Sequence, residues 1–231
     1  MNSHFNGHST LVNLKKIQQT KVLMVGLGSV GSWALLNLVK MGINNIKAYD
    51  FDTIEKHNFA NQVFSDKDIG KNKANVMQSM IADYFPNEDH KILCFPDKFE
   101  GGITKQHIVC AIADTMTTRK ILWKTAQESL SVKLFLDVRI AGAYLQCISI
   151  DMNNDNDVEW MNDPDWDLMF DDSEMEPVKC TEKGIIYSAQ MGALHYANAI
   201  GMWANENINE YPRWIEYDLG WSHSPKFLWR Q

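Results

Sequence analysis

The glycine-rich run GLGSVG at positions 26–31 is the part of this sequence best suited to bind a phosphate. It follows an apolar stretch, 21–26, that predicts a buried strand, and it opens a helix predicted over 30–41. In that setting Gly26 permits a tight turn, Gly28 lets the backbone approach a phosphate, and Gly31 allows the helix to pack closely on the strand. The N–H groups at the helix start favour an anion. The run, including Ser29, therefore predicts a nucleotide-phosphate site.

Asp50 lies near the end of the next predicted strand, 45–52, and 19 residues after Gly31. A carboxylate in this position can accept hydrogen bonds from ribose hydroxyls. A glycine loop followed by such an acid is typical of ATP-using enzymes and equally of NAD-dependent dehydrogenases. On these two features alone, both classes stay open.

The stretch after Asp50 separates the two classes. It reads DFD at 50–52, HNFANQ at 57–62 and DIGKNK at 68–73. This order resembles the ThiF/MoeB/HesA family of ubiquitin-activating-type adenylyltransferases, whose pattern is roughly D-x-D-x-x-x-x-x-N-x-x-R-Q followed by G-x-x-K. The matching positions are Asp50, Asp52, Asn58, Gln62, Gly70 and Lys73. The resemblance implies that these residues surround ATP, and it disfavours a nicotinamide-dependent oxidoreductase.

The resemblance continues to about residue 203. It implies a magnesium-associated aspartate at Asp114, beside Thr115, with Arg119 following, and a cysteine at Cys180 just before a long helix. From the residues alone, Asp114 also fits a helix N-cap, and Lys73 also fits a solvated residue in the first turn of a helix. A thiol before a helix has its pKa lowered by the helix dipole, which suits a nucleophile. A packing role for Cys180 stays open as well.

The implied chemistry is attack of a carboxylate on the α-phosphorus of ATP, which releases pyrophosphate and leaves an acyl adenylate. This reaction needs positioned anions and compensation of the developing negative charge. The resemblance implies ATP and Mg²⁺ as cofactors, a charge from Lys73, metal binding by Asp114 and acyl transfer to Cys180. The expected nucleotide site comprises Gly26, Gly28, Ser29, Gly31, Asp50, Asp52, Asn58, Asn61, Gln62, Lys73, Asp114 and Thr115.

Two positions depart from the family pattern. Asn61 stands where the family has the arginine of its R-Q step, and the first arginine in the chain is Arg119. The N-terminal segment therefore offers no arginine to the ATP site of a second subunit, which is where many relatives place one. Lys15 or Lys16 offers charge without bidentate geometry. Because both family arginines are replaced or missing, the alternative that the protein is a non-catalytic pseudoenzyme subunit stays open.

The resemblance implies a ubiquitin-like or sulfur-carrier protein as the substrate, adenylated on its C-terminal carboxylate, and a homodimer as the assembly. Within the same family, adenylation of a peptide or of a carboxylate attached to RNA is the alternative. Asp137 and Arg139 end a predicted strand, where they fit either a contact with the incoming peptide tail or a structural ion pair.

Strands and helices are predicted to alternate from residue 21 to residue 128, with helices over 30–41, 73–85 and 117–128. Strands over 133–139 and 144–151 can pair as a hairpin, a helix covers 185–203, and 214–219 is expected to add an edge strand. We therefore predict an α/β, doubly wound, Rossmann-like fold with a mainly parallel sheet and an antiparallel extension. Residues 1–231 are expected to form a single ThiF-type adenylation domain with an N-terminal arm over 1–20.

The net charge of −7 comes from one segment, since residues 151–178 contain 11 acidic residues and no Lys or Arg. The rest of the chain holds 22 basic and 18 acidic residues. Because Asn, Asp and Pro dominate the acidic segment without periodicity, we interpret it as a crossover loop. Without a dense basic stripe, nucleic-acid binding is not expected.

The longest apolar runs have the length of strands, so a membrane span is not expected. The polar opening lacks the features of a signal peptide. The four cysteines include no C-x-x-C pair, which argues against a disulfide framework and against a four-cysteine zinc site. A reducing, cytoplasmic location is expected.

Overall fold

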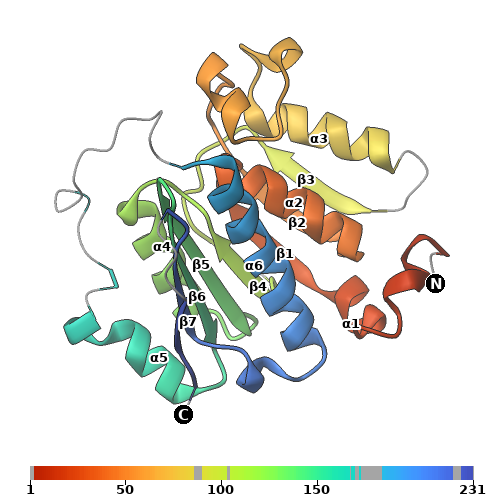
Figure 1. Cartoon of the computed structure of the whole chain (residues 1–231). Coiled ribbons are helices and arrows are strands. Elements are labelled where there is room, and N and C mark those ends of the chain that lie inside the picture. The colour runs from red at the N-terminus through yellow and green to blue at the C-terminus, as the bar shows by residue number, and fades with distance from the viewer. Residues whose placement is uncertain are drawn as a thin grey trace.

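One sheet organises the part of the chain that the computed structural model describes, which is residues 3–85, 90–102, 105–166, 168–169, 172, 184–220 and 225–230. Within these ranges the sheet has eight strands in the order β3-β2-β1-β4-β5-β6-β7-β8 (Figure 1). The strands are β1 (Lys21–Val25), β2 (Asn45–Tyr49), β3 (Lys91–Phe95), β4 (Ile108–Ala111), β5 (Leu134–Ala141), β6 (Tyr144–Asp151), β7 (Trp214–Asp218) and β8 (Lys226–Leu228). The first five in spatial order are parallel, and β5 through β8 pair antiparallel. The predicted fold class is confirmed.

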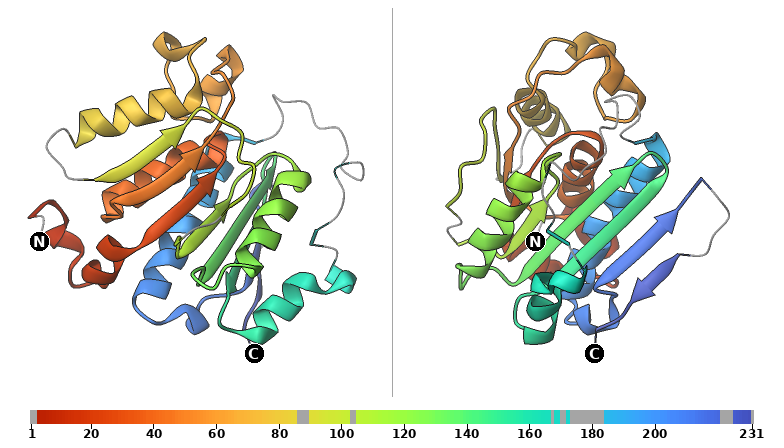
Figure 2. Two further views of the ribbon diagram at one scale, coloured as in Figure 1. Left: turned by 180° about the vertical axis from the view of Figure 1, so that it is seen from behind. Right: turned by 90° about the vertical axis from the view of Figure 1, so that its left-hand side faces the viewer.

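Helices cover both faces of this sheet (Figure 2). The α-helices are α1 (Leu14–Gln19), α2 (Ser29–Met41), α3 (Lys73–Tyr84), α4 (Met116–Gln127), α5 (Asp155–Asn162) and α6 (Ile186–Ala204). The 3-10 turns are η1 (Ser3–His8), η2 (Lys56–Ala60), η3 (Asp66–Asp68), η4 (Pro164–Trp166) and η7 (Ile208–Glu210). Buried side chains of α2, α3 and α6 form the apolar cluster on one face, whereas α4 and α5 contribute to the cluster on the other.

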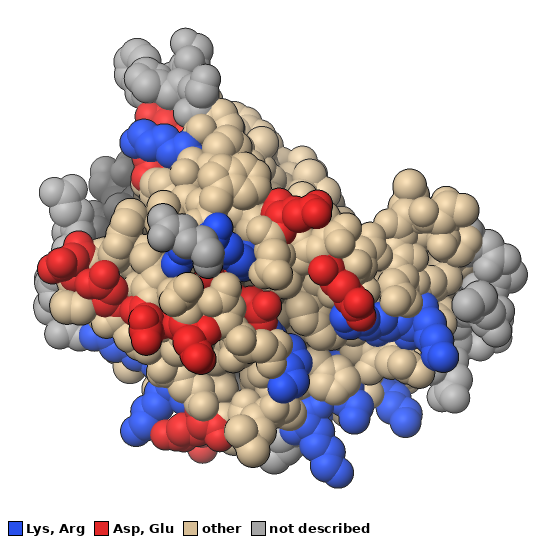
Figure 3. Space-filling view, turned by 90° about the horizontal axis from the view of Figure 1, so that it is seen from below, with Lys and Arg blue, Asp and Glu red and all other residues tan. Residues whose placement is uncertain are grey.

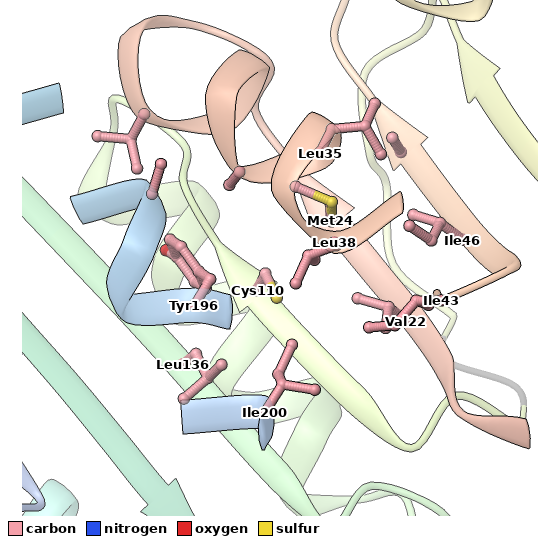
Figure 4. Packing of buried hydrophobic residues seen from close by; sticks show 14 of the residues in the cluster. Val22, Met24, Leu35, Leu38, Ile43, Ile46, Cys110, Leu136, Tyr196 and Ile200 are labelled. Carbon is pink, nitrogen blue, oxygen red and sulfur yellow. The ribbon is translucent and has the colours of Figure 1, made fainter. Parts of the chain in front are cut away.

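The apolar run in β1 is explained by burial on both faces. Val22 and Met24 belong to the cluster that α2 and α6 complete, whereas Leu23 and Val25 belong to the cluster that includes α4. A central parallel strand with both faces covered is typically apolar throughout rather than alternating. Figure 4 shows Val22 and Met24 on the same side of the sheet as Tyr196 of α6.

Tyr196 links α6 to the two central strands β4 and β5. Its buried hydroxyl donates to the carbonyl oxygen of Ala111 (2.8 Å) and accepts from the N–H of Val138 (3.1 Å). A buried hydroxyl with both functions paired carries no desolvation penalty for an unmade hydrogen bond. The contact ties the end of β4, where a loop of the predicted site begins, to neighbouring β5.

The prediction of a loop over 151–178 was wrong for the first part of that segment, which contains α5 and η4. The side chain of Asn154 caps α5 by accepting from the N–H of Asn156, and acids in the first turn interact favourably with the helix dipole. Trp160 and Met161 are buried, so α5 has a short apolar face that the surrounding acids obscure in the sequence.

Both ends of the chain differ in detail from the predicted outline. The stretch predicted as an N-terminal arm contains α1, whose Leu14 and Ile17 are buried. Lys16 Nζ donates to the carbonyl oxygen of Trp203 in α6 (3.1 Å). The strand predicted at 214–219 is present as β7, but it is not the edge strand, because β8 pairs with its outer side.

On the face seen in Figure 3, patches of Lys and Arg lie between patches of Asp and Glu, so neither charge covers this face continuously. Within the described ranges, none of the helices combines the length and the apolar character that crossing a bilayer requires.

Candidate nucleotide site

Loops of the parallel half meet at one edge of the sheet, beside the carboxyl ends of β1 and β4. The strand order changes direction between these two strands, since β2 and β3 lie on one side and β5 on the other. In doubly wound folds ligands bind at such a switch point. The glycine loop follows β1 and Asp114 follows β4, so the topology brings both to this edge (Figure 1).

The three glycines of the loop have different structural roles. Gly26 has a φ of +105°, and a Cβ there would lie 2.5 Å from the carbonyl oxygen of Ile112. A Cβ on Gly31 would overlap the carbonyl oxygen of Gly26. Gly28 is the N-cap of α2, provides no side-chain cap, and would place a Cβ in space free of atoms within 4 Å. The first and third glycines are therefore needed for packing, whereas Gly28 faces open space at the start of a helix.

Asp50 holds the glycine loop against the end of β2. Its Oδ2 accepts from the N–H of Leu27 (2.6 Å), and its Oδ1 accepts from the N–H of Asp52 (2.9 Å). Burial raises the pKa of this carboxyl, with Lys73 opposing the shift. The sequence predicted a ribose acceptor here, and the structure adds a structural role that the sequence did not suggest.

Lys73 lies in the first turn of α3 and is paired with Asp52. The distance from Lys73 Nζ to Asp52 Oδ2 is 2.7 Å, and the Lys73 side chain is only 8% exposed whereas that of Asp52 is 47% exposed. Asn72 caps α3 and donates from its amide to the carbonyl oxygens of Asp50 and Asp52. The alternative of a solvated lysine is wrong, because this ammonium is buried and directed at the loop that follows β2.

Two residues of the motif at 58–62 differ in the hydrogen bonding of their side chains. Asn58 Oδ1 accepts from the N–H of Glu55 (2.9 Å) and so closes the turn η2. Gln62 Oε1 is buried and has no hydrogen-bond partner among the described residues. Buried polar atoms are nearly always paired, so an unpaired one suits a donor from a bound group.

Asn61, which replaces the family arginine, connects two distant segments. Its Nδ2 donates to the carbonyl oxygen of Gly184 (2.7 Å), which directly precedes the entry to α6. Its own carbonyl accepts from Trp33 Nε1 (3.1 Å). The amide is therefore used to position the chain ahead of α6.

Asp114 and Thr115 directly precede α4, and only one of them is its N-cap. Thr115 is the N-cap, and its hydroxyl accepts from the N–H of Thr118 (3.3 Å). The alternative of Asp114 as the N-cap is therefore wrong, and the Thr115 hydroxyl already has a structural partner. Asp114 is exposed at the edge of the sheet.

Asp137 and Arg139 form a structural ion-pair cluster with Arg119. The carboxylate of Asp137 is fully buried and accepts from Arg119 Nη1 and from Arg139 Nε (3.0 Å) and Nη2 (2.7 Å). Arg119 Nη2 also donates to the carbonyl oxygen of Val138 (3.1 Å). Burial lowers the pKa of both guanidinium groups. Of the two sequence-based alternatives, the structural ion pair is therefore present.

Asp172 is a residue at this edge that the sequence did not single out. Its carboxylate accepts from the first two N–H groups of α4, although it lies 56 residues away from Met116 in the sequence. It is one of many acids in a segment without periodicity, so no local signal distinguishes it.

The cysteines fall into two groups. Cys180, the predicted nucleophile, lies outside the described residues. Cys94, Cys110 and Cys147 lie on β3, β4 and β6, and burial raises the pKa of each thiol, to about 12 for Cys94. The strand cysteines are therefore poor sources of thiolate.

These features fit ATP and Mg²⁺. The start of α2 lacks a side-chain cap and faces open space, and the buried ammonium of Lys73 and the exposed carboxylate of Asp114 lie at the same edge of the sheet. Among the described residues, no group of three or more His, Cys, Asp or Glu side chains can hold a metal ion. Mg²⁺ is usually held by one or two carboxylates together with substrate phosphates, and the exposed carboxylate of Asp114 is a candidate for one such ligand.

Comparison with known proteins gives a family and relatives. The sequence profile of the ThiF family matches residues 5–221. The catalytic subunit of NEDD8-activating enzyme E1 is 37% identical over 70 residues in Caenorhabditis elegans and 44% identical over 104 residues in Dictyostelium discoideum. These matches cover 30% and 43% of this chain, and 16% and 23% of the two relatives. The chain therefore spans less than a quarter of either relative.

The fold is shared with solved structures. Escherichia coli MccB, solved with MccA, has a TM-score of 0.72 and 16% sequence identity, and the alignment covers 94% of this chain and 66% of that one. The profile match covers most of the sequence and includes the glycine loop, the motif at 50–73 and Asp114. The chain belongs to the ThiF family.

Proposed function

We propose that this protein uses ATP and Mg²⁺ to adenylate the C-terminal carboxylate of a ubiquitin-like or sulfur-carrier protein. The observation that carries the proposal is the open start of α2, with Gly28 at its N-cap, at the same edge of the sheet as Lys73 and Asp114. Membership of the ThiF family and relatives named as NEDD8-activating enzymes support the reaction class.

In this proposal the loop at 26–31 and the N–H groups of α2, including that of Ser29, receive the phosphates. Asp50 and Gln62 are the candidates for contacts with the nucleoside, because the first is a carboxylate at the end of β2 and the second has an unpaired buried oxygen. Lys73 turns from Asp52 toward the phosphates and offsets negative charge as the substrate carboxylate attacks the α-phosphorus. Asp114 holds Mg²⁺, which polarises the phosphates when bound.

The replacement of the family arginine by Asn61 has a defined consequence in this proposal. The Asn61 amide is bonded to Gly184 and carries no charge, so charge compensation depends on Lys73 and the metal. We expect the chemical step to rely on these two groups more heavily than in relatives that keep the arginine.

Transfer to Cys180 is the second step of the proposal. The Cys180 thiolate attacks the acyl carbon of the adenylate, the bond from that carbon to the phosphate oxygen breaks, and AMP leaves as a thioester forms. Adenylation itself needs no thiol. Cys180→Ser is therefore expected to retain pyrophosphate exchange and to lose a reducible covalent adduct with the carrier.

Exchange of labelled pyrophosphate into ATP tests the proposal. Purified protein is incubated with ATP, Mg²⁺ and a panel of small carrier proteins ending in Gly-Gly, each paired with a version whose C-terminus is amidated. Exchange is expected with a free carboxylate and not with the amidated control. Exchange with short peptides alone would assign the peptide class instead. ATP binding without exchange for any carboxylate would favour a non-catalytic subunit.

A further inference from the structure

Asp172 connects the acidic crossover segment to the first turn of α4. Its Oδ1 accepts from the N–H of Met116 (2.5 Å), and its Oδ2 accepts from the N–H (3.0 Å) and the hydroxyl (2.5 Å) of Thr117. The first N–H groups of a helix have no partner within the helix, so a carboxylate here satisfies donors and interacts favourably with the helix dipole. These three hydrogen bonds lower the pKa of Asp172 and favour its charged form.

A second contact holds the same segment to β5. Arg139 Nη2 donates to the carbonyl oxygen of Leu168 (2.7 Å) while the same guanidinium remains paired with the buried carboxylate of Asp137. Leu168 and Asp172, which lie four residues apart in the sequence, are thus bonded to β5 and α4, respectively. Both points belong to elements that end or begin at the edge where Asp114 lies.

Asp172 lies close enough to Asp114 for their charges to interact. Asp172 bonds to Met116, which is only two residues after Asp114. The Cα atoms of residues two positions apart lie at most about 7 Å from each other. Both carboxylates also act electrostatically on the guanidinium of Arg119. Any cation held by Asp114 therefore lies within the field of Asp172.

We propose that the contact of Asp172 with the first turn of α4, here called the Asp172 latch, and a phosphate-bound Mg²⁺ at Asp114 reinforce each other, so that loading with Mg·ATP strengthens this contact. This inference rests on the proposed ATP and Mg²⁺ site. The positive end of the α4 dipole opposes a nearby cation, and the carboxylate of Asp172 offsets that positive end. Because coupling between two binding events is reciprocal, a latch that favours the metal is itself favoured by the metal.

The same electrostatics predict that Asp172 disfavours the binding of ATP without metal. The phosphates are then uncompensated anions, and the charge of Asp172 opposes them. A purely structural role for the latch would change both affinities in the same direction. The directions in which the affinities for Mg·ATP and for metal-free ATP change therefore distinguish charge coupling from a general loss of local structure.

Asp172→Asn and the matched control Asp165→Asn test the proposal by calorimetric titration. Asp165 is an exposed acid in η4 of the same segment, so its replacement removes the same charge without removing the bonds between Asp172 and the first turn of α4. Asp172→Asn is expected to weaken binding of Mg·ATP roughly three- to tenfold and to leave unchanged or strengthen binding of ATP in EDTA. Asp165→Asn is expected to match wild type in both. Weakening in both conditions, or no weakening of Mg·ATP, would overturn the coupling.

Hydrogen–deuterium exchange at the N–H groups of Met116 and Thr117 provides a second readout. In wild-type protein, saturating Mg·ATP is expected to slow exchange at both amides at least threefold, and in Asp172→Asn it is expected to have little effect. Unchanged or faster exchange in wild type would contradict the latch. If wild type binds no Mg·ATP, the proposed function itself fails. If it binds but the Asp172 variant behaves as wild type, only this inference fails.

Discussion

Helices α2 and α4 begin at the same edge of the sheet, but their first turns are completed in opposite ways. At α2 the N-cap is Gly28, which offers no side chain and faces open space. At α4 the hydroxyl of Thr115 caps the first turn, and the carboxylate of Asp172 accepts from two further N–H groups. One helix start is left unfilled, and the other is filled by the protein's own side chains.

This difference separates two kinds of anion site. A helix start without internal partners satisfies its N–H groups with water or with a bound anion, whereas a capped start has fewer donors left. On the proposed function, ATP phosphate therefore belongs to α2, and the start of α4 contributes Asp114 and the latch. Variants that remove charge from the open site, or exchange the properties of the two helix starts, test this assignment.

The largest effect is expected from Lys73→Ala, which removes the buried ammonium beside the open site. The loss of a charge that acts on the transition state costs roughly 10²–10³ in rate, so pyrophosphate exchange is expected to fall by that factor. Lys71→Ala is the matched control, because Lys71 lies two residues before Lys73, has an exposed side chain and pairs with Asp68. Exchange at the wild-type rate by a folded Lys73→Ala protein would remove Lys73 from the site.

Gly28→Asp would make the start of α2 resemble that of α4. The new side chain meets no atom within 4 Å of its Cβ, and a carboxylate at an N-cap is favourable, so the fold is expected to be retained. Its charge would occupy the position assigned to phosphate, and ATP affinity is expected to fall more than tenfold, measured by calorimetry. Gly28→Ser supplies a cap without charge as a control. Wild-type affinity in Gly28→Asp would place the phosphates elsewhere.

Local patterns were sufficient to predict most of the fold. The apolar runs of β1 and β4 are buried on both faces, and the alternation of strands and helices up to α4 follows from periodicity. The helix α5 was missed because its apolar face consists of two adjacent residues, Trp160 and Met161, within a run of acids. The acidic composition obscured the helical pattern of apolar residues in this stretch, and only the burial of Trp160 and Met161 in the folded protein shows it.

The candidate site was predictable where its signal is local. The spacing of the glycines and the motif at 50–73 depend on neighbours in the sequence, and they place Gly28 and Lys73 at one edge of the sheet. The contacts of Asn61 with Gly184 and of Asp172 with Met116 join residues 123 and 56 positions apart. Sequence spacing does not predict contacts between residues so far apart in the chain, so only the folded structure shows them.

Thr115→Ala sharpens the comparison at α4. Loss of an N-cap hydroxyl is expected to lower the free energy of unfolding by about 1 kcal/mol, because the N–H of Thr118 loses its acceptor. ATP affinity is expected to stay within twofold of wild type, since the hydroxyl is used by the helix. Thr125→Ala, in the same helix but away from its start, is the control for urea unfolding. A large loss of ATP affinity with unchanged stability would restore the nucleotide role predicted for Thr115.

The smallest effect concerns the protonation of the two carboxylates that organise these helix starts. Burial raises the pKa of Asp50 above its ordinary value of 3.8, whereas hydrogen bonds from Thr117 lower that of Asp172. The stabilisation from Asp172 is therefore fully present above its unfolded pKa and is lost as the pH falls through its lower folded value. For Asp50 the sign is reversed, because the folded state retains the proton to higher pH and stability is lost as the pH rises through its raised folded value.

Carboxyl carbon NMR from pH 2 to 7 measures both groups in one titration, with assignments from Asp50→Asn and Asp172→Asn. The two resonances are expected to titrate on opposite sides of 3.8. The stability difference between wild type and Asp172→Asn is expected to be largest near neutral pH and to shrink in acid. If Asp172 titrates at or above its ordinary value, its carboxylate does not cap α4 in solution. The two helix starts would then differ only by Thr115, and the latch would lose its structural basis.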